Sequence, residues 1–238
     1  MRPKISICIA TYNGERYIAQ QLDSILPQLS SDDEIIISDD GSNDSTIDII
    51  YGFADSRIKL IKNPREKGYT SNFENALIHC NNDIIFLSDQ DDIWIDNKIS
   101  SCLSELENAD FIVHDAIITD SNLSAISESY FKERGVYNGF SLNILKFGYL
   151  GCCFAFKKKI LDKAIPFPSN HKLCTHDNWL FLIAERYFRT KIISNKLIFY
   201  RRHISNTSTG GKKKNLDLIF MIKYRLYILY NIIKRSNR

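Results

Sequence analysis

The amino-acid sequence predicts an α/β fold in which a mostly parallel sheet carries helices on both faces. The first hundred residues alternate between short apolar runs and segments of helical period. The apolar runs are continuous and do not alternate with polar residues, which is typical of parallel strands covered on both faces. Strands joined at this spacing by helical crossovers indicate a doubly wound layer.

Four strands and three helices account for this first half of the chain. The expected strands cover residues 4–10, the apolar part of 33–44, 57–63 and 83–89. The expected helices cover 16–26, 45–54 and 69–80. In the first helix, Ile18, Leu22 and Ile25 fall on one face, as the burial of an amphipathic helix requires.

The second half of the chain has a less regular pattern. A strand is expected over 109–120, a strand leading into a helix over 148–161, a helix over 176–188, and one or two strands over 191–203. Residues 121–148 are polar with scattered aromatic residues and receive no assignment. Residues 207–215, "TSTGGKKKN", have the composition of a linker.

Charge and cysteine usage exclude some classes of protein. The net charge of +3 is too small to indicate a nucleic-acid binder, so no nucleic-acid partner is expected. None of the six cysteines forms a CxxC pair, and no histidine stands at a zinc-finger offset. The N-terminal apolar run is too short for a signal peptide. We therefore expect reduced, mostly buried thiols in a cytosolic protein.

The C-terminal segment, residues 216–238, predicts an amphipathic helix with basic flanks. Its apolar stripe consists of Leu218, Ile219, Ile222, Leu226, Leu229 and Ile233. Asp217, Arg225, Asn231 and Arg235 lie opposite, and lysines precede and close the segment. Lys223 and Arg225 interrupt the apolar run, which argues against a membrane span. The pattern favours a helix lying on an anionic membrane surface, and the alternative is a helix docked on the protein's own core.

Polar clusters follow three of the predicted strands. They read "TYNG" (11–14), "DDGSND" (39–44) and "DQDD" (89–92). Because the carboxyl ends of parallel strands lie along one edge of a sheet, where ligands bind in doubly wound folds, we expect these clusters to converge. "DDGS" alone is also compatible with an ordinary turn, and Tyr12 with simple loop packing.

The cluster at 89–92 suits a divalent cation. Carboxylates are the ligands that Mg²⁺ and Mn²⁺ prefer, and a cation would neutralise the crowded charge of Asp89, Asp91 and Asp92. The alternative is a solvated loop whose aspartates cap the next helix. Further along, "THDNW" (175–179) offers Asp177 as a general base or as an ordinary helix-start residue. "YRRH" (200–203) offers cations for a diphosphate, or a solvated basic surface.

Taken together, these motifs resemble those of the family 2 glycosyltransferases, which have the Rossmann-like GT-A fold. The set is "ISICIATYNG", "EIIISDDGSNDST", "KGYTSNFENAL", "IIFLSDQDDIW", "THDNW" and "YRRHISN". It extends to about residue 207 and is most similar to bacterial enzymes that build O-antigen, capsule or exopolysaccharide units. In those enzymes the motif at 176–179 often reads His-Asp-Trp-Trp, whereas this chain has Asn178 at the third position.

The resemblance implies a role for several residues. Asp40 would bind the nucleotide base with Tyr12 against it, Asp89 would contact the ribose, and Asn72 would line the donor pocket. Asp91 would ligate Mn²⁺ or Mg²⁺, with His203 helping to hold the metal or the diphosphate. Asp177 would be the catalytic base.

These roles imply an inverting hexosyltransferase that uses a UDP- or dTDP-sugar donor. The acceptor would be a saccharide, free or linked to a polyprenyl diphosphate, at the cytoplasmic face of the inner membrane. Residues 1–210 would then form one domain, with 1–100 as the nucleotide-sugar half and 101–210 as the acceptor half, followed by the tail at 211–238.

Two other classes of function compete with this hypothesis. A Mg²⁺-dependent nucleotidyltransferase could use a similar sheet, but it would need a glycine- and lysine-rich phosphate loop near the N-terminus, and "TYNGER" is a poor candidate. A non-catalytic, membrane-associated partner could share the motifs, but the presence of both Asp91 and Asp177 argues against it.

Overall fold

The computed structural model describes residues 2–203 and 218–236. The strands are β1 (Ile5–Thr11), β2 (Glu34–Asp39), β3 (Ile58–Lys62), β4 (Ile84–Asp89), β5 (Ile93–Trp94), β6 (Phe111–Thr119), β7 (Ala125–Ser127), β8 (Phe154–Lys157) and β9 (Thr190–Arg201). The α-helices are α1 (Ile18–Ile25), α2 (Thr46–Gly52), α3 (Tyr69–Ile78), α4 (Lys98–Leu106), α5 (Tyr130–Arg134), α6 (Phe140–Leu145), α7 (Leu161–Ala164), α8 (His176–Tyr187) and α9 (Leu218–Ser236). Short 3₁₀ turns occur at η1 (Leu26–Gln28), η2 (Gly151–Cys153) and η3 (Lys158–Ile160).

All strands of the described chain belong to one mixed sheet. Its order is β3-β2-β1-β4-β8-β6-β9-β5, and β7 pairs with β6 outside this path. The four strands β1 to β4 are mutually parallel, as the continuous apolar runs predict. β8 runs antiparallel to both of its neighbours, β4 and β6, whereas β6 and β9 are parallel.

The register of the parallel strands aligns the three polar clusters. Thr11 at the end of β1 lies opposite Asp39 of β2, and Ala10 lies opposite Asp89 of β4. The loops that follow these strands therefore leave the sheet at the same edge. The predicted convergence of the three clusters is confirmed.

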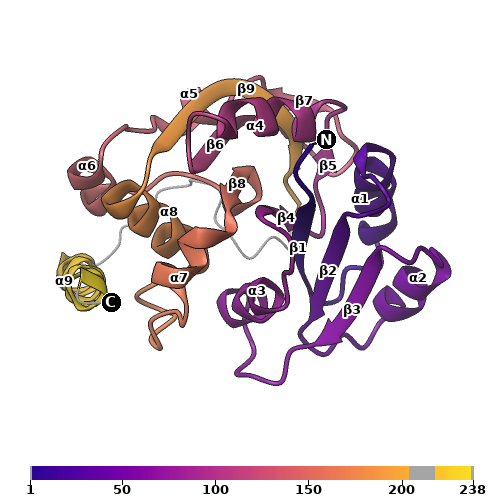
Figure 1. Ribbon diagram of the computed structural model, residues 1–238, viewed down its shortest axis with the longest axis horizontal. Helices are drawn as coiled ribbons and strands as arrows, with labels where there is room; N and C mark the ends of the chain where they lie inside the picture. The colour runs from indigo at the N-terminus through magenta and orange to yellow at the C-terminus, as the bar shows by residue number, and fades with distance from the viewer. Residues whose placement is uncertain (1, 204–217, 237–238) are drawn as a thin grey trace.

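Helices cover both faces of this sheet. Around β1–β3, α1 and α2 lie on one face and α3 on the other (Figure 1). Around β6, Phe111 packs edge-on against Phe181 of α8 at 6.1 Å, while α4 covers the opposite face. The predicted α/β class with helices on both faces is therefore confirmed.

The second half departs from the expected pattern in two places. Residues 121–148, which carried no clear period, contain β7, α5 and α6. The predicted strand in 148–161 is short because η2 precedes it and η3 follows it. Residues 190–201 form one strand, β9, whose pairing with β6 shifts register near Asp115.

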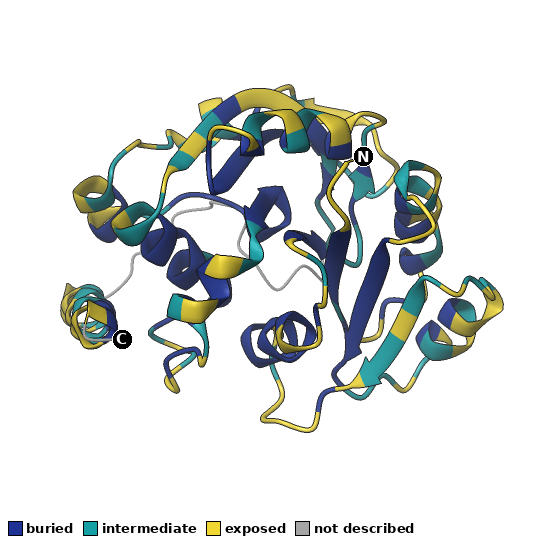
Figure 2. Cartoon of the chain, in the orientation of Figure 1, coloured by how far each residue is buried: buried dark blue, intermediate teal, exposed yellow. Residues whose placement is uncertain are grey.

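The core consists of the inner strands and the helix faces against them (Figure 2). All six cysteines are buried and free, as expected. The predicted linker at 207–215 lies outside the described residues. Among the described helices, none combines the length and the apolar composition needed to cross a bilayer.

Candidate active site

The loops after β1 and β2 are tied together by reciprocal hydrogen bonds. The Asn13 backbone N–H donates to Ser42 Oγ at 2.9 Å, and the Asn43 N–H donates to Asn13 Oδ1 at 3.0 Å. The Gly14 N–H donates to Thr46 Oγ1 at 2.7 Å. These bonds fix the two loops as one rigid wall at the edge of the sheet.

Gln90 joins the β4 loop to the same wall. Its Oε1 accepts from Thr11 Oγ1 at 2.6 Å and from the Tyr12 N–H at 3.0 Å, and its Nε2 donates to the Tyr12 carbonyl at 3.1 Å. The motif "DQDD" alone could not predict this role, because the partners of Gln90 lie more than 70 positions earlier in the chain. Tyr12 itself is 48% exposed, and Lys67 Nζ lies over its ring, 5.5 Å from the ring centre.

The side chains of Asp40 and Asn72 form hydrogen bonds with other residues of the chain. Asp40 accepts from Asn63 Nδ2 at 2.8 Å and from the Gly68 N–H at 2.7 Å, one bond to each oxygen. Each carboxylate oxygen keeps a second lone pair for a ligand. Asn72 is buried and donates to the Thr11 carbonyl at 3.1 Å, while its Oδ1 has no partner among the described residues.

The three aspartates after β4 occupy different environments. Burial and the charge of Asp91 raise the pKa of Asp89 to about 7, against an opposing hydrogen bond from the Cys152 thiol. Burial, with the charges of Asp91 and Asp89, raises the pKa of Asp92 well above its usual range. Asp92 does not cap the next helix, because α4 begins at Lys98 with Asn97 at its N-cap. Instead its Oδ1 accepts from the Arg201 N–H at 3.0 Å.

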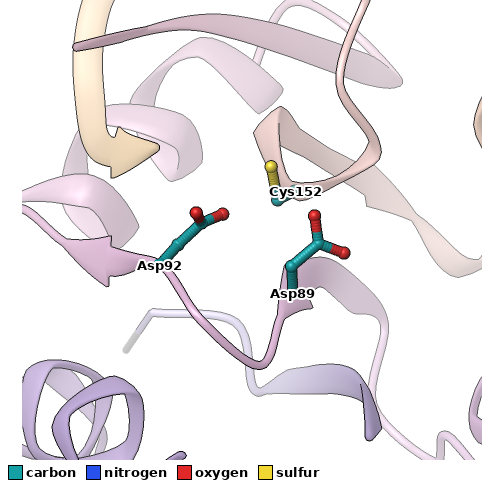
Figure 3. A group of neighbouring side chains, drawn as sticks. All are labelled: Asp89, Asp92 and Cys152. Atoms are coloured by element: carbon teal, nitrogen blue, oxygen red, sulfur yellow. The ribbon is translucent and has the colours of Figure 1, made fainter. Parts of the chain in front are cut away.

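Cys152 lies beside Asp89 and Asp92, of which Asp92 is buried and Asp89 partly buried. One ligand atom from each of Asp89, Asp92 and Cys152 lies within 4.8 Å of the others, and Figure 3 shows both carboxylates directed into the space beside the thiol. Asp92 Oδ2 has no hydrogen-bond partner among the described residues. No sequence motif connects Cys152 with Asp89 or Asp92, so this contact could not be predicted from the sequence.

Two nitrogen-bearing side chains, His203 and Lys98, accompany the carboxylates. His203 Nε2 lies 2.8 Å from Asp91 Oδ2, so the chain brings together the two residues expected to hold a metal. Lys98 is fully buried, donates to the Cys152 carbonyl at 2.8 Å, and stands 4.0 Å from the centre of the Trp94 ring. Burial lowers the pKa of Lys98, and the neighbouring cysteines, Cys153 foremost, and Asp92 oppose this shift.

Asp177 stands in the first turn of α8, where the helix dipole favours a negative charge. Its Oδ1 accepts from the Thr175 hydroxyl and from the Asn178 N–H, the latter at 2.8 Å. Its Oδ2 has no hydrogen-bond partner among the described residues. The turn η2 places Asp177 near the β4 carboxylates: the Cβ position of Gly151 lies 3.5 Å from the Asp177 Cβ, and the next residue, Cys152, lies beside Asp89 and Asp92.

His176 connects the two halves of the chain. Its ring stacks on Phe73 of α3 at 4.2 Å, and neither ring nitrogen has a partner within the described chain. A Cβ placed on Gly151 would come within 2.7 Å of His176 Nε2 and 3.5 Å of the Asp177 Cβ. Only glycine at 151 lets η2 approach α8 this closely.

The residues present fit a hard divalent cation. Three carboxylates gather within one short loop, two of them have raised pKa values, and a buried oxygen of Asp92 lacks a partner. Such crowded, oxygen-rich charge is relieved by a cation of the Mg²⁺ or Mn²⁺ type.

Comparisons with known proteins agree with this geometry. Ligands of doubly wound folds bind outside the carboxyl ends of the parallel strands, which is where this chain carries its carboxylate cluster. The sequence profile of glycosyl transferase family 2 matches residues 6–165. The chain belongs to this family and is a glycosyltransferase, so the nucleotidyltransferase alternative is wrong.

Two curated relatives extend over nearly the whole chain. An Escherichia coli protein, "UDP-Glc:alpha-D-GlcNAc-diphosphoundecaprenol beta-1,3-glucosyltransferase WfgD", is 29% identical and covers 96% of this chain and 92% of its own. The "dTDP-rhamnosyl transferase RfbG" of Shigella flexneri is 31% identical and covers 91% of this chain and 81% of its own.

Solved structures share the fold. TarS 1-349 of S. aureus, in complex with UDP-GlcNAc, has a TM-score of 0.70 at 17% identity and covers 98% of this chain and 74% of its own. Glucosyl-3-phosphoglycerate synthase from Mycobacterium tuberculosis, in complex with Mn²⁺, UDP and glucosyl-3-phosphoglycerate, has a TM-score of 0.62 at 15% identity, with 99% and 80% covered. These neighbours establish the GT-A fold of this chain.

We predict that Gly14→Ala lowers the free energy of unfolding by about 1–3 kcal/mol. The added Cβ would come within 2.4 Å of Gln90 Oε1, so the amide must move and lose its bonds to Thr11 and Tyr12. Urea denaturation measures the loss. Gly52→Ala is the matched control, because no atom lies within 4 Å of its Cβ position.

The double variant Gly14→Ala/Gln90→Ala tests the cause of this loss. It should be no less stable than Gln90→Ala alone, since the clash and the bonds involve the same amide. If the stability losses of Gly14→Ala and Gln90→Ala add in the double variant, Gly14 is needed for a reason other than its contact with Gln90.

Proposed function

We propose that this protein transfers a hexose from a nucleoside-diphosphate sugar to an acceptor hydroxyl with inversion, with Asp177 as the catalytic base. The observation that carries the proposal is the placement of Asp177. Its Oδ1 is engaged by Thr175 and Asn178, its Oδ2 is free of protein partners in the described chain, and η2 links it to the carboxylates after β4 through Gly151 and Cys152. A carboxylate held in this way can accept a proton through one defined oxygen.

The donor side of the proposal uses the rigid wall at the sheet edge. Tyr12 offers an exposed ring to the nucleotide base, and Asp40 retains lone pairs that can accept from the base. Asp89, at the end of β4 and next to β1, would bind the ribose. Asn72 is held against the Thr11 carbonyl, so its role would be to support this wall from behind.

The metal belongs beside these residues. Asp91 would hold Mn²⁺ or Mg²⁺, with His203 as a neighbouring ligand, because the two side chains already meet at 2.8 Å. Bound there, the cation supplies charge stabilisation for the leaving diphosphate. The chain's own part is to orient the donor against the wall and to remove the acceptor proton at Asp177. A base on one side and a diphosphate leaving on the other favour in-line displacement.

The substrate class follows from the relatives. One is named for UDP-glucose and a GlcNAc-diphosphoundecaprenol acceptor, and another for a dTDP-rhamnosyl transfer. We therefore propose a UDP- or dTDP-hexose donor and a saccharide acceptor on a polyprenyl diphosphate, used in bacterial surface polysaccharide synthesis. UDP-glucose with a synthetic GlcNAc-diphosphate lipid is the first pair to assay, and dTDP-rhamnose is the second donor.

The C-terminal helix supports a position on the cytoplasmic face of the inner membrane. Most of the apolar stripe expected from the sequence is exposed on α9, between 48% and 66% for Leu218, Ile219, Ile222, Leu226 and Ile233. Leu229 is the exception, being half-buried against the core. The exposed Lys223 and Lys234 border the stripe. An apolar stripe with basic flanks fits an anionic lipid surface, where a lipid-linked acceptor would also lie.

We predict that Asp91→Ala removes the Mn²⁺-dependent part of UDP binding, lowering affinity at least about tenfold. Isothermal calorimetry with UDP, with and without Mn²⁺, measures it. Asp96→Ala is the control, because Asp96 is an exposed carboxylate on the same segment. Unchanged Mn²⁺-dependent affinity in Asp91→Ala would overturn the metal assignment.

For the base, we predict that Asp177→Asn lowers kcat by about 10²–10⁴-fold while UDP affinity stays unchanged. Asparagine keeps the Oδ1 acceptor for Thr175 and Asn178 but cannot take up the acceptor proton. UDP release with the substrates above measures the rate. Asp162→Asn, an exposed aspartate in the first turn of α7, is the control. Wild-type turnover in Asp177→Asn would place the base elsewhere.

For the membrane, we predict that Ile222→Glu/Leu226→Glu lowers flotation with phosphatidylglycerol vesicles more than tenfold. Each exposed aliphatic side chain contributes about 1.5–3 kcal/mol when buried, and the new charges oppose the anionic surface. Tyr51→Glu, at the exposed end of α2 far from α9, is the control (Figure 1). Unchanged flotation, or a loss of self-association in its place, would show that the stripe does not bind lipid.

A further inference from the structure

The C-terminal helix docks on the domain through the face that the sequence marks as polar. Ile228 and Ile232 are buried there, and Arg235 is buried beside them with its guanidinium donating to the Pro166 carbonyl. The Tyr227 hydroxyl accepts from the Asn170 N–H at 3.0 Å. The exposed apolar stripe lies on the other side, so one face of α9 packs on the domain and the opposite face remains exposed.

One of these docking contacts reaches the helix that carries Asp177. The Asn178 side chain donates through Nδ2 to the Tyr224 hydroxyl at 3.3 Å. The backbone N–H of the same Asn178 donates to Asp177 Oδ1 at 2.8 Å. Residue 178 therefore contacts α9 through its side chain and the candidate base through its backbone.

The amide of Asn178 is held from both sides. Its Oδ1 faces the Cys174 thiol at 3.7 Å, while Nδ2 faces Tyr224, and the residue is only 5% exposed. Burial, with the charge of Asp177 adding to it, raises the pKa of Tyr224. The Tyr224 hydroxyl thus stays protonated close to Asp177. If that hydroxyl is removed, a buried amide donor is left without its partner, and the first turn of α8 is the part that must adjust.

We propose that Tyr224 is a positioning residue for glycosyl transfer: through Asn178 it fixes the first turn of α8, and with it the direction of the free oxygen of Asp177. The C-terminal helix is then part of the acceptor side of the active site as well as a surface element. This inference rests on the proposed function only in taking Asp177 as the base.

Kinetics test the transfer side of the inference. Tyr224→Phe removes one oxygen, and we expect kcat to fall about fivefold to tenfold with the donor KM unchanged, because misorientation affects the reacting step and not the donor wall. Asn178→Ala should cause a similar loss, and the double variant should lose no more than either single one. The assay is UDP release from UDP-glucose with the GlcNAc-diphosphate lipid.

Tyr227→Phe is the matched control. It removes another hydroxyl that holds α9, but one that binds the 165–175 loop and not α8. It should keep wild-type kcat. An equal loss of kcat in Tyr227→Phe, or additive losses in the double variant, would overturn the specific role of Tyr224.

Hydrogen exchange makes the inference testable without turnover. The amides of residues 177–180 should exchange faster in Tyr224→Phe than in wild type, with strands β1 and β4 unchanged. Unchanged exchange at 177–180 overturns the coupling even if Asp177→Asn is inactive. Faster exchange together with an active Asp177→Asn would retain the coupling and refute the base.

Discussion

The crowding of carboxylates after β4 is the constraint on which the rest of the site depends. Asp89, Asp91 and Asp92 follow one another within four positions, and like charges this close, with Asp92 buried, cannot all remain ionised without a compensating cation. Several contacts reduce the electrostatic repulsion among these aspartates. A backbone N–H from β9 binds Asp92, His203 meets Asp91, and the Cys152 thiol lies beside Asp89. These partners come from η2, from β9 and from the residues after β9, so the second half of the chain completes the site that the first half begins.

The parallel half could be predicted from the sequence because its signals are local. Four continuous apolar runs separated by helical periods leave little choice of topology, and the strand register then brings the loops together. The second half could not be predicted in the same detail. β8 is four residues long between two 3₁₀ turns, and residues 121–148 form short elements that depend on contacts with distant segments, such as Phe131 N–H with Asp115. Short-range patterns carry no information about such pairings.

In the candidate site too, some residues could be predicted from local sequence motifs and others could not. The sequence motifs marked Asp40, Asp89, Asp91 and Asp177, which stand at or just after the end of a strand or at the start of a helix. They did not mark Gln90, Lys98 or Cys152, whose roles arise only from tertiary contacts. The helical wheel of the tail found the stripe that is mostly exposed, but it could not show that Arg235 on the opposite side would be buried against the Trp179 ring, 5.7 Å away.

The 3₁₀ turn η2 has a consequence for how such enzymes diversify. Within three residues it places Gly151 against His176 of α8 and Cys152 beside Asp89 and Asp92. A side chain at 151 would displace His176, which stacks on Phe73, and a different one at 152 would alter the surroundings of Asp89 and Asp92. If α8 serves the acceptor and the aspartates serve the donor, as proposed above, donor and acceptor preferences would be coupled through this turn. Changes of sugar specificity should accumulate instead in the exposed loops, where one substrate can be exchanged without disturbing the other.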